Sequence, residues 1–302
     1  MKNILLIVNP VSGKKTSKKL LSKTILELEK NNFELEIIKS KYKGHIKKIL
    51  NTHNIQKYYC CCIMGGDGSF HEAINGLIIR ADNFKIPLAL IPAGSGNSLC
   101  RDLNILKFED AIKNIIINKK QNIDIAEISF NNHKIYSFNI IGWGMVANIG
   151  INAEKYRWLG TSRYTILSLF EIIFKKTNRT IITYYDKNNK KYELDGNFMF
   201  AVACNTIHTG KGMKIAPKAK LNDGLIDLVL IKNASRIKLL KLMPKLFTGK
   251  HINDDIVEYI HISKMKLIPN KNNQLNIDGE IKGETPFKLK VIPDAIEIIT
   301  SL

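Results

Sequence analysis

Residues 58–80 read YYCCCIMGGDGSFHEAINGLIIR, and this stretch decides the fold. The run Tyr58 to Met64 is largely apolar and has the length of a buried strand. From Ser69 to Arg80 apolar residues recur at the spacing of an α-helix, so a glycine-rich turn joins a strand directly to a helix. Strands that alternate with helices in this way are typical of a parallel sheet with helices on its faces.

The same alternation fills the first 120 residues of the chain. Further strands are predicted over Ile4–Asn9, Glu34–Ile38 and Pro87–Ile91, and further helices over Thr16–Lys30 and Gly44–Asn51. The carboxyl ends of parallel strands meet at one edge of a sheet, where ligands bind. Three of these ends carry glycine-rich turns, which we expect to share one site: Asn9–Gly13, Gly65–Ser69 and Pro92–Asn97.

After about Gln121 the pattern changes to short segments of alternating polarity, which predict a mainly antiparallel sheet. Helical patterns interrupt it at Arg163–Lys175 and Ser235–Phe247. Because single cores rarely exceed about 250–300 residues, we expect two domains, an α/β domain over residues 1–122 and a β-rich domain over 123–302. The strands of the second domain are predicted over Asp124–Phe130, Thr180–Tyr185, Phe198–Cys204, Leu225–Ile231 and Lys288–Ile292.

The composition is that of a globular protein, with 45% hydrophobic and 24% charged residues. Polar residues interrupt every apolar run before the roughly 18 residues that a spanning helix needs, and the N-terminal run is too short for a signal peptide. We therefore expect a cytoplasmic protein that is not integral to a membrane. The cysteines show no metal-ligand spacing and are expected to be reduced: Cys60, Cys61, Cys62, Cys100 and Cys204.

A net charge of +19 suits anionic lipid, phosphate ligands or nucleic acid. Lysine is spread along the chain beside many Asn and Ile residues, so a general compositional bias also explains the excess. No zinc-finger, RNP or leucine-zipper pattern is present, and we expect no nucleic-acid partner.

Each glycine-rich turn frees backbone N–H groups that can bind an anion, and a turn that opens a helix adds the positive end of the helix dipole. Three such turns at successive strand ends predict a nucleotide site. The pattern is not a Walker P-loop, which would need glycine at Val8 and serine or threonine at Lys15.

Among the residues of these turns, Asp67 is the hardest to explain by a purely structural role. A carboxylate among N–H donors would itself occupy the anion site unless a metal ion or a substrate hydroxyl engages it. Asp67 is therefore the candidate general base or metal-orienting residue. Ser69 and Glu72 have the S-x-x-E spacing of a capping box, which predicts that both cap the helix over residues 69–80.

The motif GGDGSFHEAING at residues 65–76 resembles the core motif of the diacylglycerol kinase catalytic domain superfamily, which includes sphingosine and ceramide kinases. Four more stretches resemble that family, in the family's order. They are NPVSGK at 9–14, PAGSGNS at 92–98, GWGMVAN at 142–148 followed by EKYRWLG at 154–160, and IDGE at 277–280. The third turn and the Trp-Gly segment are similar to the sphingosine and ceramide kinase branch.

The resemblance implies a lipid kinase that uses ATP and Mg²⁺, with an α/β nucleotide-binding domain, a β-rich lipid-binding domain and an active site in the cleft between them. It implies that Asp67 takes the proton of the lipid hydroxyl and that Trp143 and Asn148 contact the lipid. It places the nucleotide against Asn9, Ser12, Gly13, Ser40, Gly65, Gly66, Gly68, Glu72, Ser95, Gly96, Asn97, Arg157, Arg163, Gly279 and Glu280. From the residues alone, the two arginines would be solvated helix charges, although guanidinium groups suit phosphate oxygens.

Two departures from the family bear on the lipid. Sphingosine kinases carry an aspartate shortly after the Trp-Gly pair, which receives the amino and hydroxyl groups of the lipid, and the matching residue here is Gly150. Asn148 or Asn152 could replace this aspartate, but neither supplies a negative charge for the ammonium group of the lipid. Residues 217–227, PKAKLNDGLID, resemble bacterial diacylglycerol kinases, in which the aspartate before glycine helps to hold Mg²⁺. Asp223 has that position, although Asn-Asp-Gly before an apolar run is also an ordinary turn.

Residues 236–247 carry apolar side chains at positions 237, 240, 243 and 247 with lysines between them. An interfacial helix has this pattern, and so does a core-packed helix with a basic outer face. Pro244 predicts a kink.

Together these features predict a lipid kinase that contacts an anionic membrane peripherally and phosphorylates a primary hydroxyl. A sphingoid base or ceramide is the first candidate substrate, and diacylglycerol is the alternative. A NAD kinase shares the Gly-Gly-Asp-Gly turn but not the HEAING that follows it, and a non-catalytic, nucleotide-gated membrane adaptor is the remaining alternative. The sequence does not indicate an oligomeric state.

Overall fold

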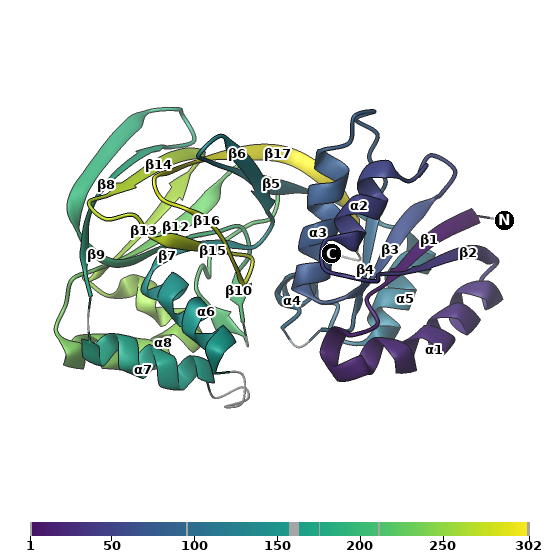
Figure 1. Cartoon of the computed structure of the whole chain (residues 1–302), viewed down its shortest axis with the longest axis horizontal. Helices are drawn as coiled ribbons and strands as arrows, with labels where there is room; N and C mark the ends of the chain where they lie inside the picture. The colour runs from purple at the N-terminus through teal and green to yellow at the C-terminus, as the bar shows by residue number, and fades with distance from the viewer. Residues whose placement is uncertain (1, 95, 157–162, 175, 211, 301–302) are drawn as a thin grey trace. The chain divides into compact units, whose positions relative to one another are not determined.

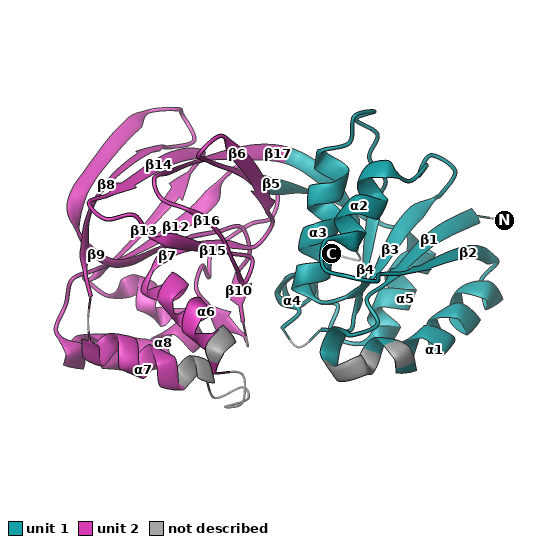
Figure 2. Ribbon diagram, viewed as in Figure 1, with its two compact units in different colours: residues 1–125, 294–302 teal, residues 126–293 magenta. Residues whose placement is uncertain are grey.

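The computed structural model describes residues 2–94, 96–156, 163–174, 176–210 and 212–300 (Figure 1). The chain forms two compact units (Figure 2). Unit 1 comprises Met1–Ile125 and Asp294–Leu302, and unit 2 comprises Ala126–Pro293. The sequence places the boundary after residue 122, three residues before the division, but it also assigns everything that follows to the second domain. The segment from Asp294 onward instead belongs to unit 1.

Unit 1 contains a parallel sheet with the strand order β4-β3-β1-β2. The end of β17 joins it beside β4, where Ile298 pairs with Leu88. The α/β class predicted from the sequence is confirmed. The strands are β1 (Lys2–Val8), β2 (Phe33–Lys39), β3 (Cys60–Gly65), β4 (Leu88–Pro92) and β17 (Phe287–Ile299); the helices are the 3₁₀ turn η1 (Ser12–Lys15), α1 (Thr16–Lys30), α2 (His45–Thr52), α3 (Asp67–Ile78), α4 (Ser98–Asp102) and α5 (Phe108–Ile117).

Every residue of the central strand β3 is buried, which explains its unbroken apolar sequence. Burial raises the pKa of the Cys61 thiol, so this cysteine packs as a small neutral hydrophobe. All five cysteines are free and buried.

Unit 2 is built from antiparallel strands, as the alternating pattern predicts. Its central strand β9 (Lys191–Cys204) pairs with three neighbours: β7 (Ile140–Gly144), β8 (Asn178–Tyr185) and β12 (Ile226–Lys232). The remaining strands are β5 (Lys120–Phe130), β6 (His133–Ser137), β10 (His208–Thr209), β11 (Met213–Lys214), β13 (Val257–Ile262), β14 (Lys264–Pro269), β15 (Gln274–Ile277) and β16 (Glu280–Glu284).

The helices of unit 2 are α6 (Met145–Lys155), α7 (Arg163–Phe174) and α8 (Arg236–Thr248), with a short 3₁₀ helix η3 (Lys250–Asn253). Ser235 caps α8 by accepting a hydrogen bond from the Lys238 N–H at 3.3 Å, and Pro244 lies inside this helix without ending it. Among the described helices, none combines the length and the apolarity needed to cross a bilayer.

Four lysines stand opposite one another on the exposed side of unit 2, where Lys264 pairs with Lys290 and Lys266 with Lys288 across β14 and β17. Like charges directly opposite on antiparallel strands are destabilising. We expect Lys266→Glu to raise the free energy of unfolding by about 0.5–1 kcal/mol, because it replaces a repulsive pair with an attractive one. Urea titration checks this, with Lys48→Glu on the exposed face of α2 as the control; equal effects of the two variants would contradict the pairwise explanation.

Candidate active site

Three glycine-rich turns lie side by side in unit 1, because backbone hydrogen bonds of the parallel sheet continue into them. The Asn9 N–H donates to the Met64 carbonyl at 3.0 Å, and the Ala93 N–H donates to the Gly65 carbonyl at 2.8 Å. At the next strand end, the Ser40 N–H donates to the Val8 carbonyl at 2.8 Å. The turns that follow β1, β3 and β4 are therefore neighbours, as the sequence predicts.

Two of the turns touch backbone to backbone. A Cβ atom added to Gly94 would lie 2.4 Å from the Cα atom of Gly66, and one added to Gly65 would lie 2.4 Å from the Ser69 Oγ atom. No side chain fits at either position without displacing its neighbour. Glycine is needed here because the turns approach each other closely, which also keeps their N–H groups clear of side chains.

Asp67 is the first residue of α3 and is half-buried. Both of its carboxylate oxygens accept the Ser98 N–H, at 2.8 and 3.1 Å, so Asp67 joins the second turn to the start of α4. Burial raises the pKa of the neighbouring Cys100 thiol to about 12, and the negative charge of Asp67 adds to this rise. The carboxylate of Asp67 is thus held in a fixed place by the third turn.

The predicted capping box is wrong. Helix α3 begins at Asp67, its cap is Gly66 in an extended conformation, and no side chain caps it. Ser69 instead accepts a hydrogen bond from the Asn9 side-chain amide at 2.9 Å, and so ties the first turn to the second. The spacing of a capping box is present, but β3 ends at Gly65 and the cap of α3 is Gly66, three residues before Ser69.

Glu72 caps a different helix. Its two carboxylate oxygens accept the Gly44 N–H at 2.7 Å and the Ile46 N–H at 3.1 Å, in the first turn of α2. These N–H groups have no partner within their own helix, and a carboxylate there also meets the positive end of the helix dipole. Glu72 therefore fixes the loop from Ser40 to Gly44 that leads into α2.

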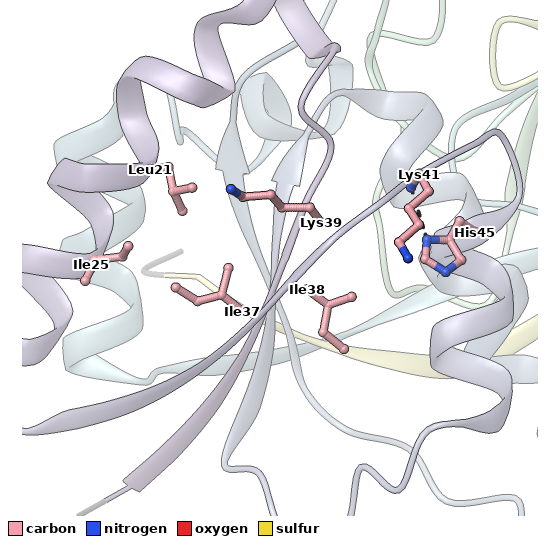
Figure 3. A pocket seen from close by; sticks show the side chains of 7 residues that line it. All are labelled: Leu21, Ile25, Ile37, Ile38, Lys39, Lys41 and His45. Carbon is pink, nitrogen blue, oxygen red and sulfur yellow. Dashed lines mark hydrogen bonds between the residues drawn. The ribbon is translucent and has the colours of Figure 1, made fainter.

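A groove of about 590 Å³ lies beside this loop (Figure 3). Helix α1, strand β2 and the start of α2 contribute its walls, and the His45 ring at its end accepts the Lys41 N–H at 3.1 Å. The lining residues are Leu21, Ile25, Ile37, Ile38, Lys39, Lys41 and His45.

Two asparagines expected to line a nucleotide site shape the turns. Asn97 closes the third turn on itself, with its side chain accepting the Gly94 N–H at 3.1 Å and donating to the Gly94 carbonyl at 3.0 Å. Asn9 accepts the Val11 N–H at 3.2 Å through its side-chain oxygen. In the first turn the Ser12 N–H donates to the Asn9 carbonyl at 3.2 Å, and Gly13 adopts a positive φ of 53°. Gly68 and Gly96 lie partly exposed in the second and third turns.

Three other expected nucleotide contacts have no described side chain. Ser95 and Arg157 lie outside the described residues. Arg163 begins α7, but its side chain is not described.

Asp278 is a buried carboxylate in unit 2, for which the sequence predicts no role of its own. It accepts four hydrogen bonds: from the Ser137 hydroxyl at 2.6 Å and from the N–H groups of Phe138, Asn139 and Ile140 at 3.3, 3.0 and 3.1 Å. It therefore holds the segment that enters β7. Its signal in the sequence is its place in the IDGE motif at 277–280, in which the resemblance assigns no role to the aspartate.

The turn that follows Asp278 carries two expected nucleotide residues. The Gly279 N–H donates to the Asn276 side-chain oxygen at 2.9 Å, and Glu280 forms an ion pair with Lys282 at 2.9 Å. Gly279 has a φ of 87°, which glycine adopts without strain.

The two residues expected to contact lipid lie in and next to the core of unit 2. Trp143 is 1% exposed and packs in the core between the strands, whereas Asn148 donates to Glu171 at 3.2 Å and links α6 to α7. At Gly150 an added Cβ atom would lie 2.7 Å from the Asn276 amide nitrogen and 3.1 Å from Ile281. A larger residue at Gly150 would displace that amide.

Asp223 is exposed, and its carboxylate accepts the Leu225 N–H at 3.1 Å, which is the hydrogen bond of an ordinary turn. Within the described part of the chain, no three or more His, Cys, Asp and Glu side chains gather as they would around a metal ion. Mg²⁺ in kinases is usually bound by one or two carboxylates together with substrate phosphates. A single exposed aspartate fits that mode of binding, and a closed protein site does not arise from the described residues.

Known families match both units. The model of the diacylglycerol kinase catalytic domain matches residues 3–128, and that of the YegS C-terminal NAD kinase beta sandwich-like domain matches residues 139–300. The chain belongs to the diacylglycerol kinase catalytic domain family. It is thus a lipid kinase of a family that uses ATP.

This lipid kinase is similar to proteins with two different substrates in their names. It is 29% identical to sphingosine kinase 1 of Arabidopsis thaliana, over 95% of this chain and 70% of the relative. It is 27% identical to the diacylglycerol kinase of Bacillus subtilis, over 95% of this chain and 92% of the relative. A crystal structure of a diacylglycerol kinase from Bacillus anthracis matches with a TM-score of 0.80 at 23% identity, over 99% of this chain and 97% of that one, and confirms the fold.

We expect Glu72→Gln in this lipid kinase to raise the KM for ATP about three- to tenfold and to leave kcat within about twofold. An amide keeps one acceptor oxygen instead of two and loses the charge at the α2 dipole, so the loop carrying Ser40 loosens. Steady-state kinetics over a range of ATP concentrations measure this, with the exposed Glu29→Gln as the control. A lower kcat at unchanged KM would instead place Glu72 at the transferred phosphoryl group.

Proposed function

We propose that this lipid kinase transfers the γ-phosphoryl group of ATP to the primary hydroxyl of a sphingoid lipid, either a sphingoid base or ceramide. The proposal rests mainly on the position of Asp67. This half-buried carboxylate lies at the start of α3 between adjoining glycine-rich turns. Asp67 accepts the proton of the hydroxyl, the hydroxyl oxygen bonds to the γ-phosphorus, and the bond to the β–γ bridging oxygen breaks so that ADP leaves. A positioned base contributes about 10²–10⁴-fold to such a reaction.

The three glycine-rich turns are the proposed binding site of the ATP triphosphate. Their close backbone contacts and the N-terminus of α3 support this assignment, since free N–H groups and the helix dipole both attract phosphate. Ser40, in the loop that Glu72 fixes, completes the proposed nucleotide contacts of unit 1. Mg²⁺ would supply charge neutralisation at the phosphates, with Asp223 as its proposed carboxylate ligand.

The sphingoid assignment is supported by the Arabidopsis sphingosine kinases, which are 29% and 28% identical to this chain. Diacylglycerol is a second candidate, and Gly150 counts against a free sphingoid base without distinguishing ceramide from diacylglycerol. A carboxylate at this position would serve to bind an ammonium group, but a side chain at Gly150 would collide with the Asn276 amide. Ceramide and diacylglycerol, which carry no ammonium group, need no such charge.

A panel of acceptors separates these candidates. Purified protein, labelled ATP and Mg²⁺ are incubated with sphingosine, ceramide or diacylglycerol in mixed micelles, and with NAD as the non-lipid acceptor. The proposal expects kcat/KM for sphingosine or ceramide to exceed that for diacylglycerol by at least about tenfold, a difference of about 1.4 kcal/mol. A preference for diacylglycerol would select the second candidate substrate. Labelling of NAD alone would contradict both the sphingoid and the diacylglycerol assignments.

Peripheral contact with a cytoplasmic membrane surface is part of the proposal. The lipids concerned reside in bilayers, so the enzyme has to work at a bilayer surface, and its net charge of +19 favours an anionic one.

A further inference from the structure

Helix α7 exposes an apolar surface along its last two turns. The outward side chains of this part of the helix are all apolar: Leu169, Phe170, Ile173 and Phe174. Phe170 is 52% exposed and Phe174 is 69% exposed, and their rings stack on each other with centroids 6.4 Å apart. The inner face of the helix packs through Leu167 and Ile172.

Helix α8 adds a second apolar stripe. It packs against the core through Leu239, Leu242 and Leu246, which are buried. A different face carries Ile237, Leu240 and Phe247, whose side chains are exposed, and Ile237 is 68% exposed. The sequence leaves a core-packed role open for the stripe at positions 237, 240, 243 and 247. Met243 does pack against the core, but the other three side chains are exposed, and the leucine face forms the main core contact of α8.

The two stripes belong to one surface. Figure 1 shows α7 and α8 side by side in unit 2, and the Arg236 guanidinium donates to the Ile173 carbonyl at 2.8 Å across the gap between the helices. Positions 236, 240 and 247 lie within one third of the α8 circumference at 100° per residue, so the exposed stripe of α8 borders the α7 side. Monomeric soluble proteins rarely expose contiguous apolar patches larger than a few hundred Å².

The charge around this surface is positive. All four charged residues of α8 are basic. Lys238 and Lys245 form ion pairs with Asp255 and Asp254, but Lys241 is exposed and has no acidic partner among the described residues. Arg236 lies on the other flank of the stripe. A large apolar face with basic flanks is the pattern of interfacial helices on anionic membranes.

We propose that the α7–α8 face, defined by Leu169, Phe170, Ile173, Phe174, Ile237, Leu240 and Phe247, inserts its side chains into the surface of an anionic bilayer. The proposal rests on the proposed function, because a kinase of membrane lipids needs such a contact, and it names the surface that makes it. The basic flanks favour a bilayer over a second copy of the chain, since two copies would bring Lys241 and Arg236 of each face together.

Vesicle binding tests the proposal without any enzyme assay. The full chain is sedimented with vesicles of phosphatidylcholine that contain phosphatidylserine, and with vesicles of phosphatidylcholine alone. The double variant Phe170→Gln, Phe174→Gln is expected to bind the anionic vesicles about 10–100-fold more weakly than the native chain. The matched control, Ile116→Gln with Ile117→Gln on α5 of unit 1, removes two similarly exposed apolar side chains and is expected to bind as the native chain does.

Charge is tested in the same way. Lys241→Gln is expected to weaken binding to anionic vesicles about threefold or more, whereas Lys288→Gln, from the lysine pairs of β14 and β17, is expected to leave binding unchanged. Equal losses in both variants would mean that overall charge drives the contact, and would overturn the assignment of the face. Native-like binding of the double phenylalanine variant would overturn it as well.

Two further measurements distinguish a failure of the membrane-contact proposal from a failure of the proposed function. Light scattering without lipid reports whether the face joins two copies; a native dimer that the phenylalanine variant converts to a monomer would overturn the proposal. With a short-chain, water-soluble substrate, kcat of the variant is expected to stay within about twofold of native, while the rate on vesicle-borne substrate falls with binding. If the native chain phosphorylates no lipid but binding still depends on Phe170 and Phe174, the proposed function fails and the docking face stands.

Discussion

Asp67→Asn is expected to lower kcat by about 10²–10⁴-fold while ATP still binds with native affinity. The asparagine oxygen can still accept the Ser98 N–H, so the contact between the second and third turns is retained. What is lost is the ability to take up a proton and the negative charge beside the turns. Steady-state kinetics give kcat, and calorimetric titration with ATP gives the affinity.

Asp195→Asn is the control for this variant, because Asp195 is exposed in unit 2 and pairs only with Arg179 among the described residues. Its kcat is expected to equal that of the native chain. If Asp67→Asn kept more than about a tenth of the native kcat, Asp67 could not be the base, since removal of a general base costs at least about a hundredfold.

Asp278→Ala is expected to lower the free energy of unfolding by about 3–5 kcal/mol. The buried carboxylate accepts one hydroxyl and three backbone N–H groups at the entry to β7, and alanine would leave these four donors without their acceptor. Asp278→Asn keeps one acceptor oxygen, so its free energy of unfolding is expected to lie between those of the native chain and Asp278→Ala. Urea unfolding followed by fluorescence measures the effect.

The surface pair of Asp195 with Arg179 again provides the comparison. Removing an exposed ion pair costs about 0–1 kcal/mol, so Asp195→Ala is expected to unfold almost as the native chain does. Similar losses in Asp195→Ala and Asp278→Ala would show that the hydrogen bonds of Asp278 contribute no more than a surface contact.

The sequence predicts the turns of unit 1 well because their signals are local. A buried strand such as β3, a run of glycines and the start of a helix follow one another within a few residues, and the parallel register then brings Asn9, Gly65 and Ala93 together. The class of fold, the order of strands and helices from β1 to β4 and the antiparallel character of unit 2 follow from such patterns, whereas α4 and α5 were not predicted.

Features that depend on residues far apart in the chain could not be predicted from the sequence. Glu72 has the spacing of a cap for its own helix, but its partners are 26 and 28 residues away at the start of α2. The return of residues from Asp294 onward to unit 1 depends on the pairing of Ile298 with Leu88, which no local pattern encodes. Helix α6 was missed because the glycines of the Trp143 region, Gly144 among them, indicate a loop rather than a helix start.

The transfer of labelled phosphate from ATP to lipid tests whether Asp67 is the base of a lipid kinase. Native protein and Asp67→Asn are incubated with γ-labelled ATP, Mg²⁺ and vesicles that contain sphingosine, ceramide or diacylglycerol, and label is counted in the extracted lipid. We expect a phosphate monoester of one of these lipids with the native chain, and at least about a hundredfold less of it with Asp67→Asn. Label that enters no lipid with the native chain, or that enters equally with both proteins, would contradict this expectation.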